Sequence, residues 1–325
     1  MNDTTKTRRA KLKTLRPKEP DNEQFFIADE YEIVSFKDDI RSMEHPFFVL
    51  KSGDAKERHY ENGNKTIKIK SIASVGIATV FDKDIWIYAV SKLQRALDEH
   101  SDDVNKFVLP NKVSFTAYDY FTCTNKSKGG KSYTDLEKCL ERLASTRITT
   151  NISHDDSIES HNFGLIESYK IKEGIKGNSM DVTYIEIILP SWILEAIKTQ
   201  KVLKISNDYF RIRKAIDRRI YEIARKHCGS QKSFIITLDK LYIKTGASSA
   251  LKVLRNNVIK LAKDNDLPDY FIEYDPVREN VTFKPRPNIL LEAKKRAERI
   301  APNNKLDPTR VSTPDQDVPA GFRGS

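Results

Sequence analysis

The two halves of the sequence predict helices and strands in the same order. This repeat limits the possible folds more than any other feature. In the first half, apolar residues at helical spacing begin after Asp82, and shorter helical patterns follow at 116–124 and 131–145. β-branched runs typical of strands then occur at 147–152, 163–172 and 180–189. We therefore expect a long helix, a short helix, a turn, a third helix and a β ribbon.

The second half shows the same order. Isoleucines from Ile212 to Ile223 mark a helix that ends near Gly229, and Gly246 marks a turn. The other expected elements are a strand, two helices and two strands, at 234–236, 237–245, 249–264, 270–274 and 280–283. This order is typical of a helix-turn-helix with a β wing. The predicted fold class is α+β, with two tandem winged-helix domains.

The length of 325 residues also favours about two domains. We expect a basic, largely disordered arm over 1–42 and an N-terminal winged helix over 43–200. A C-terminal winged helix is expected over 201–287, followed by a short helix and a disordered tail over 288–325.

Positive charge is concentrated in one block of the chain. The net charge is +10, but residues 201–263 hold 16 basic and 4 acidic residues, whereas residues 21–200 carry a net charge of −6. Such a block is the electrostatic pattern expected for a polyanion partner, with a solvated basic surface as the alternative.

Several classes of protein are excluded. The three cysteines, Cys123, Cys139 and Cys228, are too widely spaced for a disulfide framework or a paired-thiolate zinc site. The longest mostly apolar run, 71–81, is far shorter than the roughly 20 residues that span a bilayer. The basic first residues lack the apolar segment of a secretory signal. We expect a cytoplasmic protein without a membrane partner.

The stretch Gly129-Gly130-Lys131-Ser132 resembles part of a phosphate-binding loop. The full motif requires glycine at position 125, where this chain has Asn125, and no buried strand precedes it. The turn of a helix-turn-helix explains the same glycines. In that interpretation Lys126, Lys128 and Lys131 face DNA phosphates, and no nucleotide cofactor is expected.

No other motif predicts catalysis. The polar loop with His154, Asp155, Asp156, Glu159 and His161 lacks regular ligand spacing, so a solvated wing tip is favoured over a metal site. The histidines include no pair separated by one residue, as a rolling-circle nicking enzyme would need. We expect no catalytic residue, no metal and no enzymatic activity.

The pattern at 249–264 predicts a DNA-recognition helix. Its leucines and Val258 lie on one side of a helical wheel, opposite lysines and Asn256. The residues expected to contact DNA are Lys244, Ser248, Ser249, Lys252, Val253, Arg255, Asn256 and Lys260. Ser248 and Ser249 suit the N-cap, and Lys244 is expected at a phosphate. The alternative is an ordinary amphipathic surface helix.

The equivalent helix of the first half exposes Lys131, Thr134, Lys138 and Arg142, but also acidic residues that a phosphate backbone repels. Auxiliary DNA contact and protein–protein contact both remain open for this helix.

Long stretches of the chain also resemble a known family. They are MEHPFFVL at 43–50, GIATVFDKDIWIYAVSKL at 76–93, VSFTAYDYFTCTNKSKGGKSYTDLEKCLERLASTRITTNI at 113–152, NFGLIESYKI at 162–171 and DYFRIRKAIDRRIYEIARKHCG at 208–229. Over approximately 43–285 the sequence resembles the plasmid replication initiator protein A family of Gram-negative bacteria.

This resemblance implies a function. Similar initiators bind repeated origin sequences (iterons) through two winged helices, help to melt AT-rich DNA, and recruit a host initiator ATPase and the replicative helicase. Many form homodimers through the N-terminal winged helix and repress their own promoters. We therefore expect a plasmid replication initiator, located in the bacterial cytoplasm on double-stranded origin DNA. A winged-helix transcriptional regulator and a protein-interaction adaptor are the alternatives.

Overall fold

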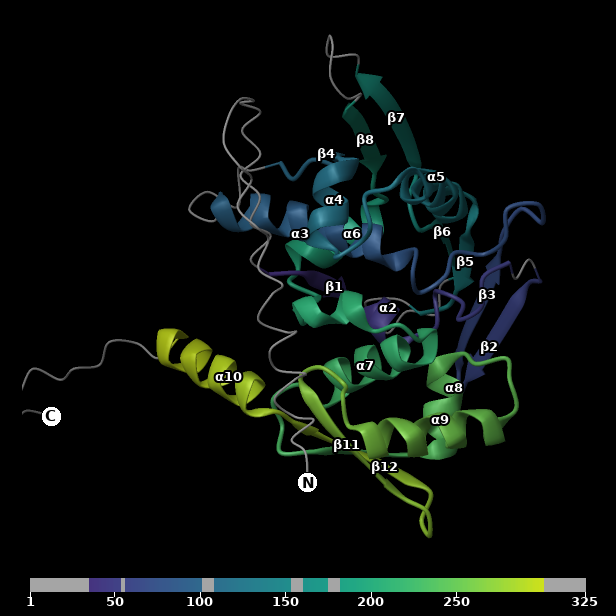
Figure 1. Ribbon diagram of the computed structural model, residues 1–325, viewed down its shortest axis with the longest axis vertical. Helices are drawn as coiled ribbons and strands as arrows, with labels where there is room; N and C mark the ends of the chain where they lie inside the picture. The colour runs from purple at the N-terminus through teal and green to yellow at the C-terminus, as the bar shows by residue number, and fades with distance from the viewer. Residues whose placement is uncertain (1–34, 54–55, 101–107, 153–159, 175–181, 301–325) are drawn as a thin grey trace, which may run out of the picture.

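The structure is a computed structural model that describes residues 35–53, 56–100, 108–152, 160–174 and 182–300 (Figure 1). The expected disorder of the first 34 residues and of the tail after 300 lies outside the described residues. No helix among the described residues is long and apolar enough to cross a membrane.

Two units with the same order of elements make up most of the molecule. The first contains α3 (Lys83–Glu99), β4 (Lys112–Thr116), α4 (Ala117–Cys123), α5 (Gly130–Ser145), β7 (Ser168–Gly174) and β8 (Val182–Ile188). The second contains α7 (Ala215–His227), β10 (Phe234–Thr237), α8 (Leu238–Thr245), α9 (Leu251–Asp264), β11 (Tyr270–Asp275) and β12 (Asn280–Pro285). Each unit has a three-stranded antiparallel sheet with its last strand in the centre, in the orders β4-β8-β7 and β10-β12-β11. The predicted repeat of elements is therefore present.

The same local signals start and end the short helix of each unit. The first strand runs directly into this helix, and its last residue, Thr116 or Thr237, is the N-cap. The Oγ1 atoms accept hydrogen bonds from the N–H groups of Asp119 and Lys240, at 3.1 and 3.4 Å. A residue with left-handed φ follows each helix: Asn125 (55°), two residues after the end of α4, and Gly246 (66°), directly after α8. These caps explain why the two short helices have similar boundaries.

A third sheet interrupts the first unit. β2 (Arg58–Asn62) and β3 (Lys65–Lys70) form a hairpin, which β5 (Arg147–Thr150) and β6 (His161–Gly164) extend in the order β2-β3-β5-β6. The single strand predicted at 163–172 is wrong, because β6 and β7 belong to different sheets. The indole N–H groups of Trp86 and Trp192 donate to the carbonyl oxygens of Leu165 and Gly164, at 3.0 and 3.2 Å. These bonds fix the crossing between the sheets.

The end of the predicted N-terminal arm is also corrected. Instead of disorder up to residue 42, β1 (Lys37–Asp39) and α2 (Ile40–Glu44) are ordered, and Asp38, Asp39 and Ser42 are buried. β1 pairs antiparallel with β9 (Val202–Lys204), and α2 packs against α7. This segment therefore joins the two units. The proposed division of the chain into domains at 43–200 and 201–287 stays a prediction.

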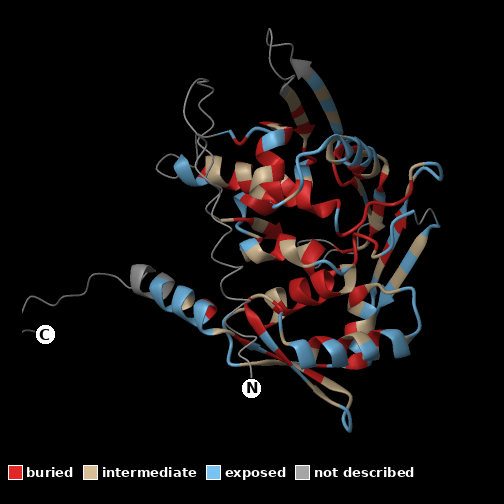
Figure 2. Cartoon of the chain, viewed as in Figure 1, coloured by how far each residue is buried: buried red, intermediate tan, exposed pale blue. Residues whose placement is uncertain are grey.

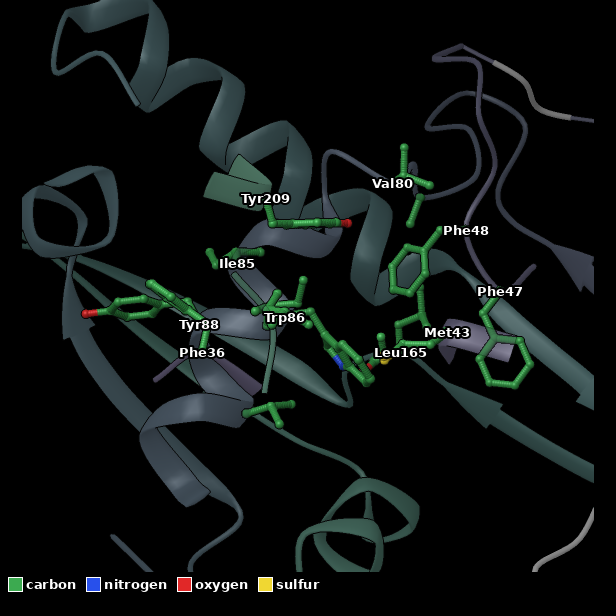
Figure 3. Packing of buried hydrophobic residues seen from close by; sticks show 14 of the residues in the cluster. Phe36, Met43, Phe47, Phe48, Val80, Ile85, Trp86, Tyr88, Leu165 and Tyr209 are labelled. Atoms are coloured by element: carbon green, nitrogen blue, oxygen red, sulfur yellow. The ribbon is translucent and has the colours of Figure 1, made fainter. Parts of the chain in front are cut away.

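The remaining helices lie around these units. They are α6 (Ser191–Lys198), the 3-10 helix η2 (Asn207–Arg211) and α10 (Pro287–Ile300), which projects from the body in Figure 1. Trp86 of α3 is the largest fully buried side chain among the described residues and packs near Phe48 (Figure 3). Its ring centroid lies 5.9 Å from that of Phe48 and 5.7 Å from that of Trp192. Burial is densest along α3 and α7 (Figure 2), so these helices form the centre of the molecule.

A buried ionic cluster connects these two central helices. Lys83 Nζ lies 2.8 Å from Asp38 Oδ2 of β1 and 3.2 Å from Glu222 Oε1 of α7, and all three side chains are at most 1% exposed. Arg219 donates to Glu222 at 2.7 Å and to the carbonyl oxygen of Ser42 at 2.8 Å. Although burial opposes ionisation, Lys83 and Arg219 lower the pKa of Glu222. The cluster fixes β1, α2, α3 and α7 relative to one another.

Replacing Lys83 tests the importance of this cluster. Lys83→Met leaves two buried carboxylates without their shared cation, and we expect the free energy of unfolding to fall by about 3–5 kcal/mol. Urea titrations followed by circular dichroism measure the change. Lys198→Met, at an exposed lysine on α6, is the control. A loss no larger than that of the control would show that the cluster does not stabilise the fold.

A second prediction concerns pH. Burial lowers the pKa of His45 to about 3, while Glu44 opposes this shift and Lys65, Arg219 and Lys244 add to it. Below pH 6.5 the unfolded chain therefore binds a proton that the folded chain excludes, so this group makes stability fall as pH decreases towards 3. The contribution is at most about 1.4 kcal/mol per pH unit.

His45→Gln removes this contribution. When the pH is lowered from 7.5 to 5, we therefore expect the free energy of unfolding to decrease less in the variant than in the wild type. Burial raises the pKa of Asp38 to about 7, and this group makes an opposite contribution to stability in both proteins. The measured quantity is therefore the difference between the two proteins in the slope of unfolding free energy against pH. His59→Gln, on the exposed strand β2, is the control. Equal slopes for wild type and His45→Gln would refute the prediction.

Candidate nucleic-acid interface

Helix α9 has one buried and one exposed face, as its sequence predicts. Leu254, Val258 and Leu261 are buried in the second unit. The exposed side chains are Lys252, Val253, Asn256, Ile259, Lys260, Lys263 and, at the end of the helix, Asp264. Two of these, Val253 and Ile259, are apolar and 47% and 45% exposed. The exposed face thus combines cations, one amide and methyl groups, which are the groups that contact phosphates, adenine edges and thymine methyls.

The beginning of α9 differs from the prediction. Its N-cap is Ala250 and no side chain caps the helix, so the proposed capping by Ser248 or Ser249 is wrong. Both serines are exposed in the connection after α8, where the Tyr242 hydroxyl donates to the Ser249 carbonyl at 2.8 Å. That bond holds the connection at the residue before the N-cap of α9. Contact of these serines with DNA stays a prediction.

Several predicted DNA-contacting cations have carboxylate partners inside the protein. In the second unit Lys244 lies 3.4 Å from Glu44, and Arg255 lies 2.6 Å from Glu279. In the first unit Lys126 lies 2.7 Å from Asp84, and Arg142 lies 2.6 Å from Asp82. Lys252 and Lys260, by contrast, have no carboxylate within 4 Å among the described residues. The exposed lysines of α9 are therefore better placed to bind an external anion.

Lys244 illustrates the difference. Its side chain is only 15% exposed, burial lowers its pKa, and its backbone carbonyl accepts two hydrogen bonds from Arg219. The residue therefore helps to join α8 to α2 and α7. A phosphate at Lys244 would compete with Glu44, so Lys252 is the better test of phosphate binding.

The first unit presents a mixed surface. Lys131, Thr134 and Lys138 are exposed on α5, but so are Asp135, Glu137 and Glu141. Lys128 Nζ lies 3.8 Å from the centre of the Tyr118 ring, a cation–π contact that orients it. Because both signs of charge alternate on this helix, DNA contact and protein contact remain open predictions.

The structure gives the glycines near residue 130 a structural role. Gly129 is the N-cap and Gly130 the first residue of α5, and a loop rather than a strand precedes them. Residues 153–159, with most of the polar loop considered as a metal site, lie outside the described residues. In the described part of the chain, no three His, Cys, Asp or Glu side chains form a group that could hold a metal ion.

One contact that positions α9 was not predicted from the sequence. Gly246, in the turn before α9, lies against Pro46, and a Cβ atom added to this glycine would lie 2.5 Å from the Pro46 Cβ. The Tyr60 hydroxyl of β2 donates to the Gly246 carbonyl at 3.3 Å. The first half of the chain therefore helps to set the position of α9. Because these partners are distant in sequence, only the unusual glycine at the turn hinted at the contact.

Comparison with known proteins identifies relatives. Residues 37–272 match the family described as Replication initiator protein A. A chain of Wigglesworthia glossinidia brevipalpis, named as a replication protein, is 51% identical over 264 residues, which are 81% of this chain and 94% of the relative.

Solved structures with some similarity include two of RctB domains 2 and 3. The first has a TM-score of 0.49 and 12% identity, covering 71% of this chain and 90% of that chain. The second has a TM-score of 0.45 and 11% identity, covering 73% and 93%.

Substitutions on α9 can separate base reading from phosphate binding. Asn256→Ala should remove a bidentate contact with adenine and reduce discrimination between the preferred and a scrambled duplex by about 1–3 kcal/mol. Lys252→Ala should instead weaken binding to both duplexes, and reduce the slope of log affinity against log salt by about one unit.

Duplexes selected by the wild-type chain from a random pool provide the preferred sequence, and binding titrations at several salt concentrations measure both quantities. Lys198→Ala is the matched control for loss of one exposed lysine. If Asn256→Ala weakened binding to both duplexes equally, α9 would not be reading bases.

Proposed function

The chain belongs to the replication initiator protein A family, and from this premise we propose that it initiates plasmid replication by binding repeated origin sequences (iterons). The observation that carries this proposal is the exposed face of α9, where Lys252, Asn256 and Lys260 are exposed and neither lysine has a carboxylate within 4 Å among the described residues. An α-helix with such a face fits the major groove of duplex DNA.

We assign both units to the winged-helix class. Support comes from the shared order of helices and strands, with the β11–β12 hairpin following α9 as the wing of the second unit. In this proposal α9 reads bases, and the lysines around it bind phosphates. The first unit contacts neighbouring DNA or a second copy of the chain.

Origin opening in this proposal is driven by binding. Several copies on tandem repeats bend the duplex, and the deformation destabilises an adjacent AT-rich segment. The chain itself hydrolyses no nucleotide. The glycine pair at the start of α5 is consistent with this, because it caps a helix rather than forming a complete phosphate loop. Host proteins, an initiator ATPase and the replicative helicase, are then recruited to the opened DNA in the bacterial cytoplasm.

Footprinting on the plasmid's own origin region tests the proposal. We expect tandem protected repeats beside an AT-rich tract, and permanganate-reactive thymines in that tract when the chain is added without ATP. Asn256→Ala should reduce both signals together, whereas Lys198→Ala should leave them unchanged.

Other outcomes identify the alternatives. A single protected operator over a promoter, without reactive thymines, would indicate a transcriptional regulator. Weak duplex binding that does not depend on salt would indicate a protein-interaction adaptor. Either result would refute the initiator assignment.

A further inference from the structure

The four-stranded sheet β2-β3-β5-β6 has a polar face that the proposed role of α9 does not use. Side chains alternate along β3, so Ile67 and Ile69 are buried while Lys68 and Lys70 are exposed. The cross-strand register places Lys68 opposite Thr149 and Lys70 opposite Arg147. We call the exposed side chains Lys68, Lys70, Arg147 and Asn162, with half-buried Thr149, the basic sheet face.

Among the described residues, the cations of the basic sheet face have no carboxylate partner. Lys68 and Lys70 have no carboxylate within 4 Å among the described residues. Arg147 instead donates Nε and Nη2 to Asn162 Oδ1, at 3.2 and 2.8 Å, which orients its guanidinium group. Among the residues of these four strands, Glu61 is the one acid, and it lies 3.4 Å from His59 near the hairpin turn.

This arrangement has an energetic cost in the free protein. Directly opposed side chains on neighbouring strands have Cβ atoms about 5 Å apart, and like charges in such positions repel. Lys70 and Arg147 form such a pair. An external anion would remove this repulsion. By contrast, Lys126 and Arg142 of the first unit and Lys244 of the second are paired with buried or half-buried carboxylates.

The chemistry of the face favours the backbone of duplex DNA over single-stranded nucleic acid. Single strands are held largely by stacking of bases on aromatic side chains. Phe163 and Tyr60 belong to the opposite face of the sheet, so the exposed face carries no Phe, Tyr or Trp ring; its one aromatic side chain among the described residues is His59, opposite Lys68 and 3.4 Å from Glu61. Lysine, arginine, threonine and asparagine side chains are typical donors to phosphate oxygens.

The sheet is attached directly to the turn that precedes α9. The Tyr60 hydroxyl bonds to the Gly246 carbonyl, and Pro46 packs on the same glycine. In Figure 1 the end of β2 lies beside α8. The turn before α9 therefore packs on the side of the sheet that carries Tyr60, opposite the basic sheet face, and this contact fixes the position of the sheet relative to α9.

We propose that the basic sheet face binds the phosphate backbone of duplex DNA next to the segment that α9 reads. This inference rests on the proposed function, because it takes α9 as the base-reading helix. The sheet adds affinity without sequence preference, since its side chains contact phosphates only. In this proposal the first half of the chain can bind DNA despite its net negative charge, because Lys68, Lys70 and Arg147 are gathered on one sheet.

The double variant Lys68→Ala/Lys70→Ala of the full chain tests the inference on footprinted origin duplexes. Hydroxyl-radical footprinting should show loss of backbone protection on one side of the α9 site, while methylation protection of bases at that site persists. On a duplex that extends past the site, affinity should fall on the order of tenfold at low salt, and the salt slope should decrease by about two units. On a duplex trimmed to the α9 site, wild type and variant should bind alike.

Lys198→Ala/Lys295→Ala is the matched control, because it removes two exposed lysines from α6 and α10. Thermal unfolding by circular dichroism checks that the variants remain folded. If the sheet variant keeps the flanking protection and the wild-type salt slope, or loses equal affinity on the trimmed duplex, the inference is wrong while the role of α9 stands. If the wild-type chain binds no origin duplex, the proposed function fails first.

Discussion

The arrangement of the central elements β1, α2, α3 and α7 depends on a fully buried lysine. Lys83 stands at the start of α3, between a carboxylate of β1 and a carboxylate of α7. A buried ammonium group is tolerated only where its charge is compensated, so alternative packings that separate Lys83 from Asp38 or Glu222 are strongly disfavoured. Residues 37–42, expected as part of a disordered arm, become structural because they bring Asp38 to this point.

Neighbouring ion pairs extend the same constraint towards the proposed DNA surface. Arg218 of α7 pairs with Asp84 of α3, which also holds Lys126 before α5. On the other side, Glu44 lies between Lys226 of α7 and Lys244 of α8, at 2.6 and 3.4 Å. The loop before α5 and the helix before α9 are thus connected through charged groups to the central helices α3 and α7. Lysine and arginine side chains thus form the ion pairs inside the protein, and the same residue types are proposed to contact DNA.

Local features of the fold were predictable from the sequence, and distant pairings were not. The amphipathic pattern of α9 gave its buried and exposed faces correctly, and Thr116, Thr237 and Gly246 marked the ends of the short helices. These signals act between residues within one turn of each other. The pairing of β1 with β9 joins residues far apart in the chain and leaves no periodic pattern. For the same reason, a free lysine such as Lys252 and a paired one such as Lys244 look alike in the sequence.

The net charge of a sequence segment therefore does not predict which surfaces of the folded protein are positive. Of the cations in the basic block 201–263, Arg218 and Arg219 are buried, and Arg225 donates to the carbonyl oxygen of Lys204 at 2.6 Å. These guanidinium groups hold the fold together and contribute little to a field outside it. Conversely, the first half is acidic in total but concentrates Lys68, Lys70 and Arg147 on one sheet. The positions of carboxylates decide which cations remain available to a polyanion. The number of cations in a segment is less informative.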